Sequence, residues 1–160
     1  MKTEHIYAPT TFDGSEGLLA TIVRKHDVPL LSCEHHGVIF HTDPNMPLQV
    51  ADLIHPKGTV IEPHVHYHVI RELIGTPEVL FIRKGKVKVD LYLSTGEYIL
   101  NRELVEGDLI ILNQGGHGLT VMEDTEILEV KQGPYMGKER DKRAIDLVQH
   151  KTTDRCNGGE

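Results

Sequence analysis

Three histidines lie at every second position of one short stretch, IEPHVHYHVI, at residues 61–70. Side chains two residues apart on a β-strand point to the same face of a sheet. If this stretch is a strand, His64, His66 and His68 share a face, and two adjacent imidazoles can reach one metal ion. Neutral imidazole is a first-choice ligand for zinc, iron, nickel and copper. Solvent-facing histidines match so short a pattern by chance, so the surrounding sequence must decide.

Two later stretches extend the pattern around these histidines. EVLFIRKG, at residues 78–85, begins with Glu78 and ends with a glycine. GDLIILNQGGHG, at residues 107–118, contains His117, which is the only histidine of that stretch. Together with Gly58, which precedes His64 by six positions, these stretches resemble the two motifs of the cupin superfamily. The fold of that superfamily is a double-stranded β-helix, or jelly-roll, barrel.

The resemblance implies a mononuclear metal site inside the barrel. In cupins the first motif supplies two histidines and a glutamate, and the second motif supplies a third histidine. Carried over to this sequence, the ligands are His64, His66, Glu78 and His117. Three imidazole nitrogens and one carboxylate suit one divalent metal ion, and Fe, Mn, Ni and Zn all stay open because ligand softness alone does not choose among them.

The sequence departs from the cupin pattern in two places. Eleven residues, 67–77, separate His66 from Glu78, where the usual gap is three or four. Glu72 lies closer to the usual gap and is the competing carboxylate. Glu78 is preferred because a glycine follows it seven positions later, and none follows Glu72 at that spacing. In the second motif Asn113 stands where proline is usual, and the spacing from glycine to histidine is one residue shorter.

The elements that must position these residues read as short strands. KVKVDLYL, at residues 86–93, alternates apolar and polar side chains, as a half-buried strand does. Further runs rich in Val, Ile and Leu follow at intervals of about ten residues and end in Gly or Pro, which favours an antiparallel barrel or sandwich. We therefore predict an all-β protein with a cupin barrel over 46–135. An N-terminal segment, 1–45, adds strands, and a charged C-terminal segment, 136–160, holds a short helix within 138–150 and is partly disordered.

Composition narrows the partners and the compartment. The chain has 160 residues and a formal charge of −7, which argues against a nucleic-acid partner because phosphate binding needs a basic surface. No apolar run is long enough for a membrane span, and the N-terminus lacks a signal-peptide apolar region. Cys33 and Cys156 have no motif spacing, which indicates a reducing compartment. We expect a cytoplasmic protein with a small-molecule ligand. Cupin barrels commonly pair through sheet edges, so the resemblance implies a homodimer.

Four further residues are candidates for contact with a substrate. His68 would lie on the same strand face as His64 and His66. It could bind the metal directly, contact one of the metal ligands or contact the substrate. Arg71 can grip a carboxylate or phosphate, or it can form a surface ion pair. In TEILEVKQGPY, at residues 125–135, Glu129 and Lys131 share one strand face. If that face lines the cavity, both are acid–base or substrate groups, and if it faces outward they are an exposed pair of little energetic value.

Several functions fit this constellation. The wider stretches 75–92 and 107–135 resemble a group of small stand-alone bacterial cupins associated with surface-polysaccharide and related biosynthetic gene neighbourhoods. The first hypothesis is a metal-dependent enzyme on a small polar metabolite, either an Fe(II)-type dioxygenase or an isomerase or epimerase, with His68, Glu129 or Lys131 moving protons. The second is a non-enzymatic cupin that holds a metal and a ligand. The third is a metal-free barrel that acts on nucleotide sugars through a histidine base. Fold alone does not choose among them.

Overall fold

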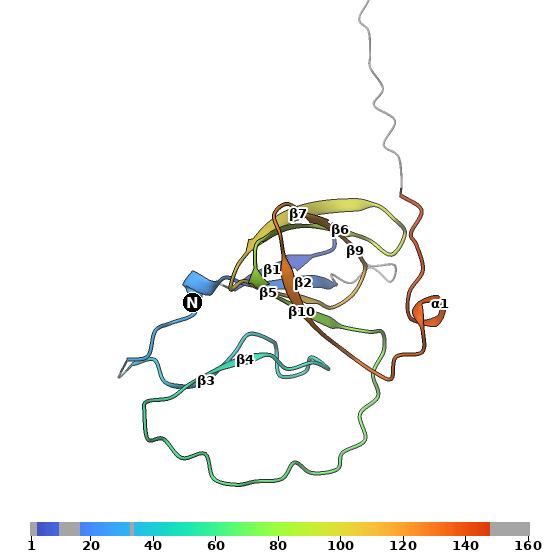
Figure 1. The fold of residues 1–160 in the computed structure, drawn as a ribbon. Coiled ribbons are helices and arrows are strands. Elements are labelled where there is room, and N and C mark those ends of the chain that lie inside the picture. The colour runs from blue at the N-terminus through green and yellow to red at the C-terminus, as the bar shows by residue number, and fades with distance from the viewer. Residues whose placement is uncertain (1–2, 10–16, 33, 148–160) are drawn as a thin grey trace, which may run out of the picture.

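The computed structural model describes residues 3–9, 17–32 and 34–147, and its regular secondary structure consists almost entirely of antiparallel strands (Figure 1). This confirms the prediction of an all-β chain. In chain order the elements are β1 (Glu4–Tyr7), β2 (Leu18–Val23), the 3-10 helix η1 (Lys25–Asp27), β3 (Gly37–Phe40), β4 (Ala51–Ile54), β5 (Glu78–Lys84), β6 (Lys86–Tyr92), β7 (Tyr98–Val105), β8 (Leu109–Leu112), β9 (Gly116–Val121), β10 (Glu126–Lys131) and the short helix α1 (Lys138–Asp141).

Two sheets enclose the hydrophobic core. One has five strands in the order β1-β2-β8-β5-β10, and the other has three in the order β7-β6-β9. The core is formed by Ile, Leu, Val and Ala side chains from both sheets, among them Ile22, Ile82 and Ile110 from the first and Val89 and Leu104 from the second. Along the described strands no ladder joins the two sheets, so the architecture is a sandwich-like pair of sheets and the barrel is not closed.

Strand β6 follows the alternation that its sequence predicts. Val87, Val89 and Leu91 are buried, whereas the residues between them are only partly buried. The chain passes from β5 into β6, and so from one sheet to the other, through Gly85. Gly85 has a φ of 84°, and a Cβ at this position would collide with the backbone of Asp124 and with Thr125. The turn between the two sheets therefore requires glycine.

The N-terminal segment adds two strands to the larger sheet. β2 pairs with β8, and β1 pairs with β2 at the sheet edge. Next along the chain, β3 and β4 form a separate hairpin. Within it His41 is 5% exposed, and its Nε2 lies 2.8 Å from Asp52 Oδ2. The sequence favours a surface or loop position for His41. The residue does lie in the loop after β3, but its burial against Asp52 rules out a surface position.

Segment 55–77 contains neither helix nor strand and stands away from the two larger sheets (Figure 1). All of residues 61–70 are exposed, including Val65 and Tyr67. Residues 61–70 are therefore not a strand in this structure, so the condition under which His64, His66 and His68 share one face of a sheet is not met. Alternation of apolar and polar side chains suits a strand, but a strand forms only where a neighbouring strand accepts and donates its backbone hydrogen bonds. No part of the described chain lies beside 61–70 to do so.

The described part of the C-terminal segment runs along the body of the protein (Figure 1). Residues 136–147, here called the C-terminal strap, contain the predicted short helix, which is limited to α1. The remainder of the predicted loose tail, and both cysteines, lie outside the described residues. No helix in the described ranges has the length and apolar character that a membrane-spanning helix needs.

Candidate metal and ligand site

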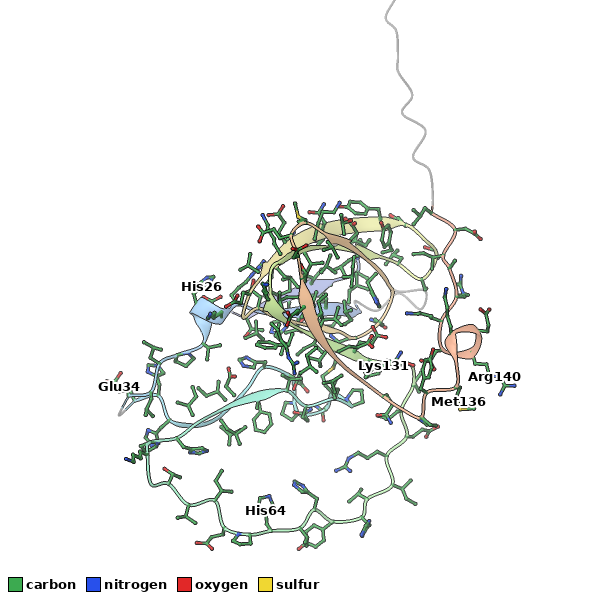
Figure 2. All side chains as sticks on the ribbon, viewed as in Figure 1. His26, Glu34, His64, Lys131, Met136 and Arg140 are labelled. Carbon is green, nitrogen blue, oxygen red and sulfur yellow. The ribbon has the colours of Figure 1, made fainter. Side chains whose placement is uncertain are left out.

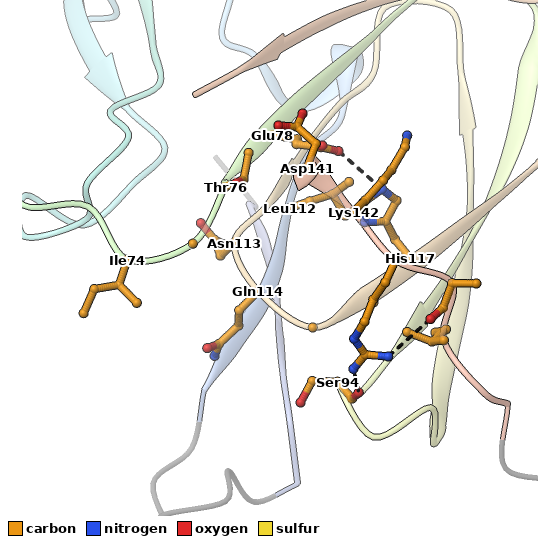
Figure 3. Close-up of a pocket in the computed structure, with 16 residues that line it drawn as sticks. Ile74, Thr76, Glu78, Ser94, Leu112, Asn113, Gln114, His117, Asp141 and Lys142 are labelled. Atoms are coloured by element: carbon orange, nitrogen blue, oxygen red, sulfur yellow. Dashed lines mark hydrogen bonds and ion pairs between the residues drawn. The ribbon is translucent and has the colours of Figure 1, made fainter. Parts of the chain in front are cut away.

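A cavity of about 700 Å³ opens between the ends of the two sheets and the C-terminal strap (Figure 3). Its walls come from four parts of the chain. These are the end of segment 55–77, the turn after β6, the β8–β9 connection and the strap. Cavities of this size hold small metabolites. The residues that carry its chemistry are Glu78, Ser94, Asn113, His117, Asp141, Lys142 and Arg143.

Glu78 and His117 meet in this cavity from opposite sheets. Glu78 starts β5 and shares a face with Leu80 and Ile82, which belong to the core. His117 on β9 pairs with the buried Leu91 of β6, so it lies on the same side of its sheet as the core, although its side chain is 34% exposed. His117 Nε2 lies 3.3 Å from Glu78 Oε2. The contact with His117 lowers the pKa of Glu78, against the opposing effect of burial, so Glu78 is a carboxylate at neutral pH.

The two histidines of the first motif lie elsewhere. His64 and His66 are exposed on segment 55–77, and their rings contact each other with centroids 5.3 Å apart. Nδ1 of His64 lies 2.8 Å from the carbonyl oxygen of Glu62. Figure 2 places His64 on the far side of this segment, well separated from Lys131 beside the cavity. Over the described ranges, no three His, Cys, Asp or Glu side chains come together as a metal site.

The other predicted substrate contacts are divided between the segment and β10. His68, Arg71 and the competing carboxylate Glu72 are exposed on segment 55–77 and do not line the cavity. Glu129 and Lys131 pair with Leu80 and Glu78, so their strand face is the interior one. Glu129 is nevertheless exposed, because β10 is the edge strand of its sheet.

Lys131 is held by the C-terminal strap. Its Nζ donates a hydrogen bond of 3.0 Å to Asp141 Oδ2 and lies 5.1 Å from the centre of the Tyr135 ring. The bond raises the pKa of Lys131 and lowers the pKa of Asp141. Lys131 is therefore an ammonium group at neutral pH, which suits a proton donor or a positive charge and does not suit a general base.

The Lys131–Asp141 pair makes attachment of the strap pH-dependent. Because the folded-state pKa of Asp141 is depressed, its contribution is complete above the unfolded pKa of about 3.9 and is lost as the pH falls below that value. We expect amide hydrogen exchange in residues 136–147, corrected for the intrinsic pH dependence, to accelerate as the pH falls below about 4. Asp141→Asn should show the acceleration already at pH 7. An unchanged strap in Asp141→Asn would contradict the assignment.

The strap also packs closely on the turn after β6. Arg143 donates hydrogen bonds to the carbonyl oxygens of Ser94, at 3.3 Å, and Ala144, at 3.2 Å. A side chain at Gly96 would collide with the backbone of Asp146. None of the site residues predicted from the sequence lies in the strap. Its charged, aperiodic sequence carries no signal that it covers a cavity between strands far away in the chain.

Asn113 is a second cavity residue that sequence reasoning did not assign. It stands where the cupin motif usually has proline, and that departure was the only signal. Its Oδ1 and Nδ2 atoms are both buried, with no hydrogen-bond partner among the residues that the structure describes. A buried amide without partners costs free energy, which a ligand group or water that reaches it would recover.

Comparison with known proteins identified no relative of this chain. The chain matches no family model, no curated protein and no solved structure.

Proposed function

We propose that this protein is a metal-dependent cupin that acts on a small polar metabolite, as a dioxygenase or as an isomerase or epimerase. The observation that carries the proposal is the Glu78–His117 pair. The cupin resemblance assigns Glu78 as the carboxylate ligand of the first motif and His117 as the histidine ligand of the second, and these two residues come from different sheets and meet at 3.3 Å in a cavity. A carboxylate oxygen and an imidazole nitrogen at that separation suit one divalent ion by donor type.

His64 and His66 fit the same ion by donor type but not by position. They form a contacting pair of their own, so the four proposed ligands exist as two pairs. Residues 67–77 between His66 and Glu78 span more than about 30 Å when extended, and Ile74, Gly75 and Thr76 already line the cavity. The proposal requires segment 55–77 to fold onto the cavity. The chain between the two pairs is long enough for that movement.

In this proposal the bound ion would polarise the substrate at its open coordination positions. The residues of the chain have separate tasks. Lys131, held as an ammonium by Asp141, supplies positive charge beside Glu78 and can donate a proton. His68 would arrive with His64 and His66 if segment 55–77 moves. The ligand is a small molecule, and a homodimer in the cytoplasm remains our prediction from the sequence.

A second candidate function is acid–base catalysis without metal. The contact of Glu78 with His117 is the observation that favours it, since a carboxylate beside an imidazole fixes the orientation of the ring. Here His117 would remove a proton from a nucleotide sugar or related substrate, and His64 and His66 would have no role in the chemistry. A cupin that only holds a metal and a ligand is the outcome expected if no turnover is found.

Elemental analysis of protein purified without a histidine tag or chelator tests these functions, followed by oxygen uptake after anaerobic Fe(II) loading with pools of candidate metabolites. One metal ion per chain with substrate-dependent oxygen consumption supports the dioxygenase. One ion per chain without oxygen consumption supports isomerisation or ligand binding. Absence of metal even after reconstitution would overturn the metal proposal. Acid–base catalysis by His117 would then be the remaining candidate function.

A further inference from the structure

The C-terminal strap brings two cations to the cavity. Lys142 and Arg143 both line it, and neither forms an ion pair within the described parts of the chain. The lining also holds two carboxylates: Glu78 contacts His117, and Asp141 forms an ion pair with Lys131. The charge of Lys142 lowers the pKa of both carboxylates, whereas Arg143 has no carboxylate partner among the ion pairs of the described residues. In a chain with a net charge of −7, two cations without an ion-pair partner at a cavity indicate a site for an anion.

Arg143 is held in place for this role. Its two hydrogen bonds, to Ser94 and Ala144, fix the guanidinium against the turn after β6 and occupy only part of its five N–H donors. The remaining donors can bind an oxyanion with charge-assisted hydrogen bonds. A guanidinium that is already ordered loses little further conformational freedom when the ligand binds.

Asn113 provides an independent sign of a ligand. Its amide oxygen and nitrogen are buried without partners at the cavity wall, on the β8–β9 connection across from the strap (Figure 3). An amide offers both a donor and an acceptor, which suits the hydroxyl or carbonyl groups of a polar metabolite. The cavity therefore combines cations on the strap with a neutral polar group on the sheet side.

We propose that the cavity binds a small polar metabolite carrying an oxyanion, a carboxylate or a phosphate, which Lys142 and Arg143 of the C-terminal strap bind while Asn113 contacts its uncharged part. This inference deepens the proposed function by naming the substrate class, and it rests on that function for the chemistry performed in the cavity. It also assigns anion binding to the cations of the strap and not to Arg71, because Arg71 lies outside the cavity.

The test is a titration of isotope-labelled full-length protein with inorganic phosphate and, separately, with succinate, followed by amide chemical shifts. It is run once in chelator-treated protein and once after metal loading. We expect saturable shifts at residues 94 and 141–145 with at least one of the two anions. Lys142→Gln and Arg143→Gln should each weaken binding about tenfold, as expected for the loss of one charge-assisted hydrogen bond. The anion that binds more tightly identifies the type of oxyanion that the site prefers.

Lys138→Gln is the matched control, because Lys138 is an exposed cation of the same strap that does not line the cavity. It should bind as the unchanged protein does. Equal weakening in Lys138→Gln, or no saturable shifts with either anion, would overturn the proposal. Saturable binding in protein that never takes up metal would support the anion site while the metal function fails. If the protein binds metal but the Lys142 and Arg143 variants bind the anion as tightly as the unchanged protein, the metal function stands and the anion site is overturned.

Discussion

His117→Ala is expected to reduce bound metal from one ion per chain to near zero, and His66→Ala is expected to do the same. Each change removes one of four proposed donors, and loss of an imidazole ligand leaves the ion with too few protein ligands to compete with water. The measurement is metal content by elemental analysis after dialysis against a metal-buffered solution. Thermal unfolding of the metal-free variants checks that each still folds.

The carboxylate ligand is tested by a matched pair of variants. Glu78→Ala should lose metal to the same extent as His117→Ala, because Glu78 lies in the cavity beside His117. Glu72→Ala should retain it, because Glu72 is exposed on segment 55–77. Retention of full metal by His66→Ala and His117→Ala together would eliminate the site. Loss in Glu72→Ala that equals the loss in Glu78→Ala would move the carboxylate role to Glu72.

The same experiment reports on segment 55–77. If His64 and His66 join Glu78 and His117 around an ion, metal should protect this segment from proteolysis, since the extended exposed chain becomes attached to the cavity. His117→Ala should abolish that protection, although the substituted residue lies on β9 and not in the segment. Equal cleavage of the segment with and without bound metal would mean that the two pairs do not share one ion.

Asp108→Ala is expected to lower the free energy of unfolding by about 3–5 kcal/mol, the usual cost of removing one partner from a buried ion pair. The Asp108 side chain is 1% exposed. Its carboxylate accepts hydrogen bonds from Arg24 Nη1 at 2.8 Å, from the backbone N–H of Lys25 at 3.0 Å and from that of Val105 at 3.1 Å. The change leaves these three donors without their acceptor at the ends of β2 and β7.

Urea denaturation measures this loss, with Glu4→Ala as the control. Glu4 forms a pair of similar length with Arg102, at 2.7 Å, but both side chains are more than a third exposed. Removing an exposed pair costs only about 0.2–1 kcal/mol. Similar losses in the two variants would show that burial does not set the value of the Asp108 contact. The Asp108 network is a structural role for the aspartate of the GDLI stretch, separate from the metal proposal.

Local sequence patterns were sufficient for the strand class and for part of the interior. The alternation in KVKVDLYL predicted which side chains of β6 are buried, because period-two burial depends only on the strand having one face on the core. The glycine after EVLFIRK marks a turn whose positive φ requires it. The same reasoning placed Glu78 at the start of a strand, whereas the strand that carries His117 was not predicted.

Local patterns failed where a neighbouring segment decides the structure. The alternation at 61–70 is as clear as that in β6, but it becomes a strand only beside a partner, and this chain presents none there. The face of Glu129 and Lys131 stayed open in the sequence. The register of β10 with β5 places both on the face of the core-lining residues of β5, but Glu129 is exposed and only Lys131 is partly buried. His41 lies in a loop, as the sequence suggested, but its burial against Asp52 was not predictable from the sequence.

The sequence by itself determined an all-β chain, its antiparallel strands and the two residue types, a carboxylate and an imidazole, that meet at the cavity. Only the tertiary structure decided that Glu78 and His117 meet at 3.3 Å from opposite sheets while His64 and His66 lie apart from them. It also decided that Lys142 and Arg143 border the same cavity. These are contacts between residues distant in the chain, and they depend on how the sheets and the strap pack, which neither spacing nor periodicity specifies.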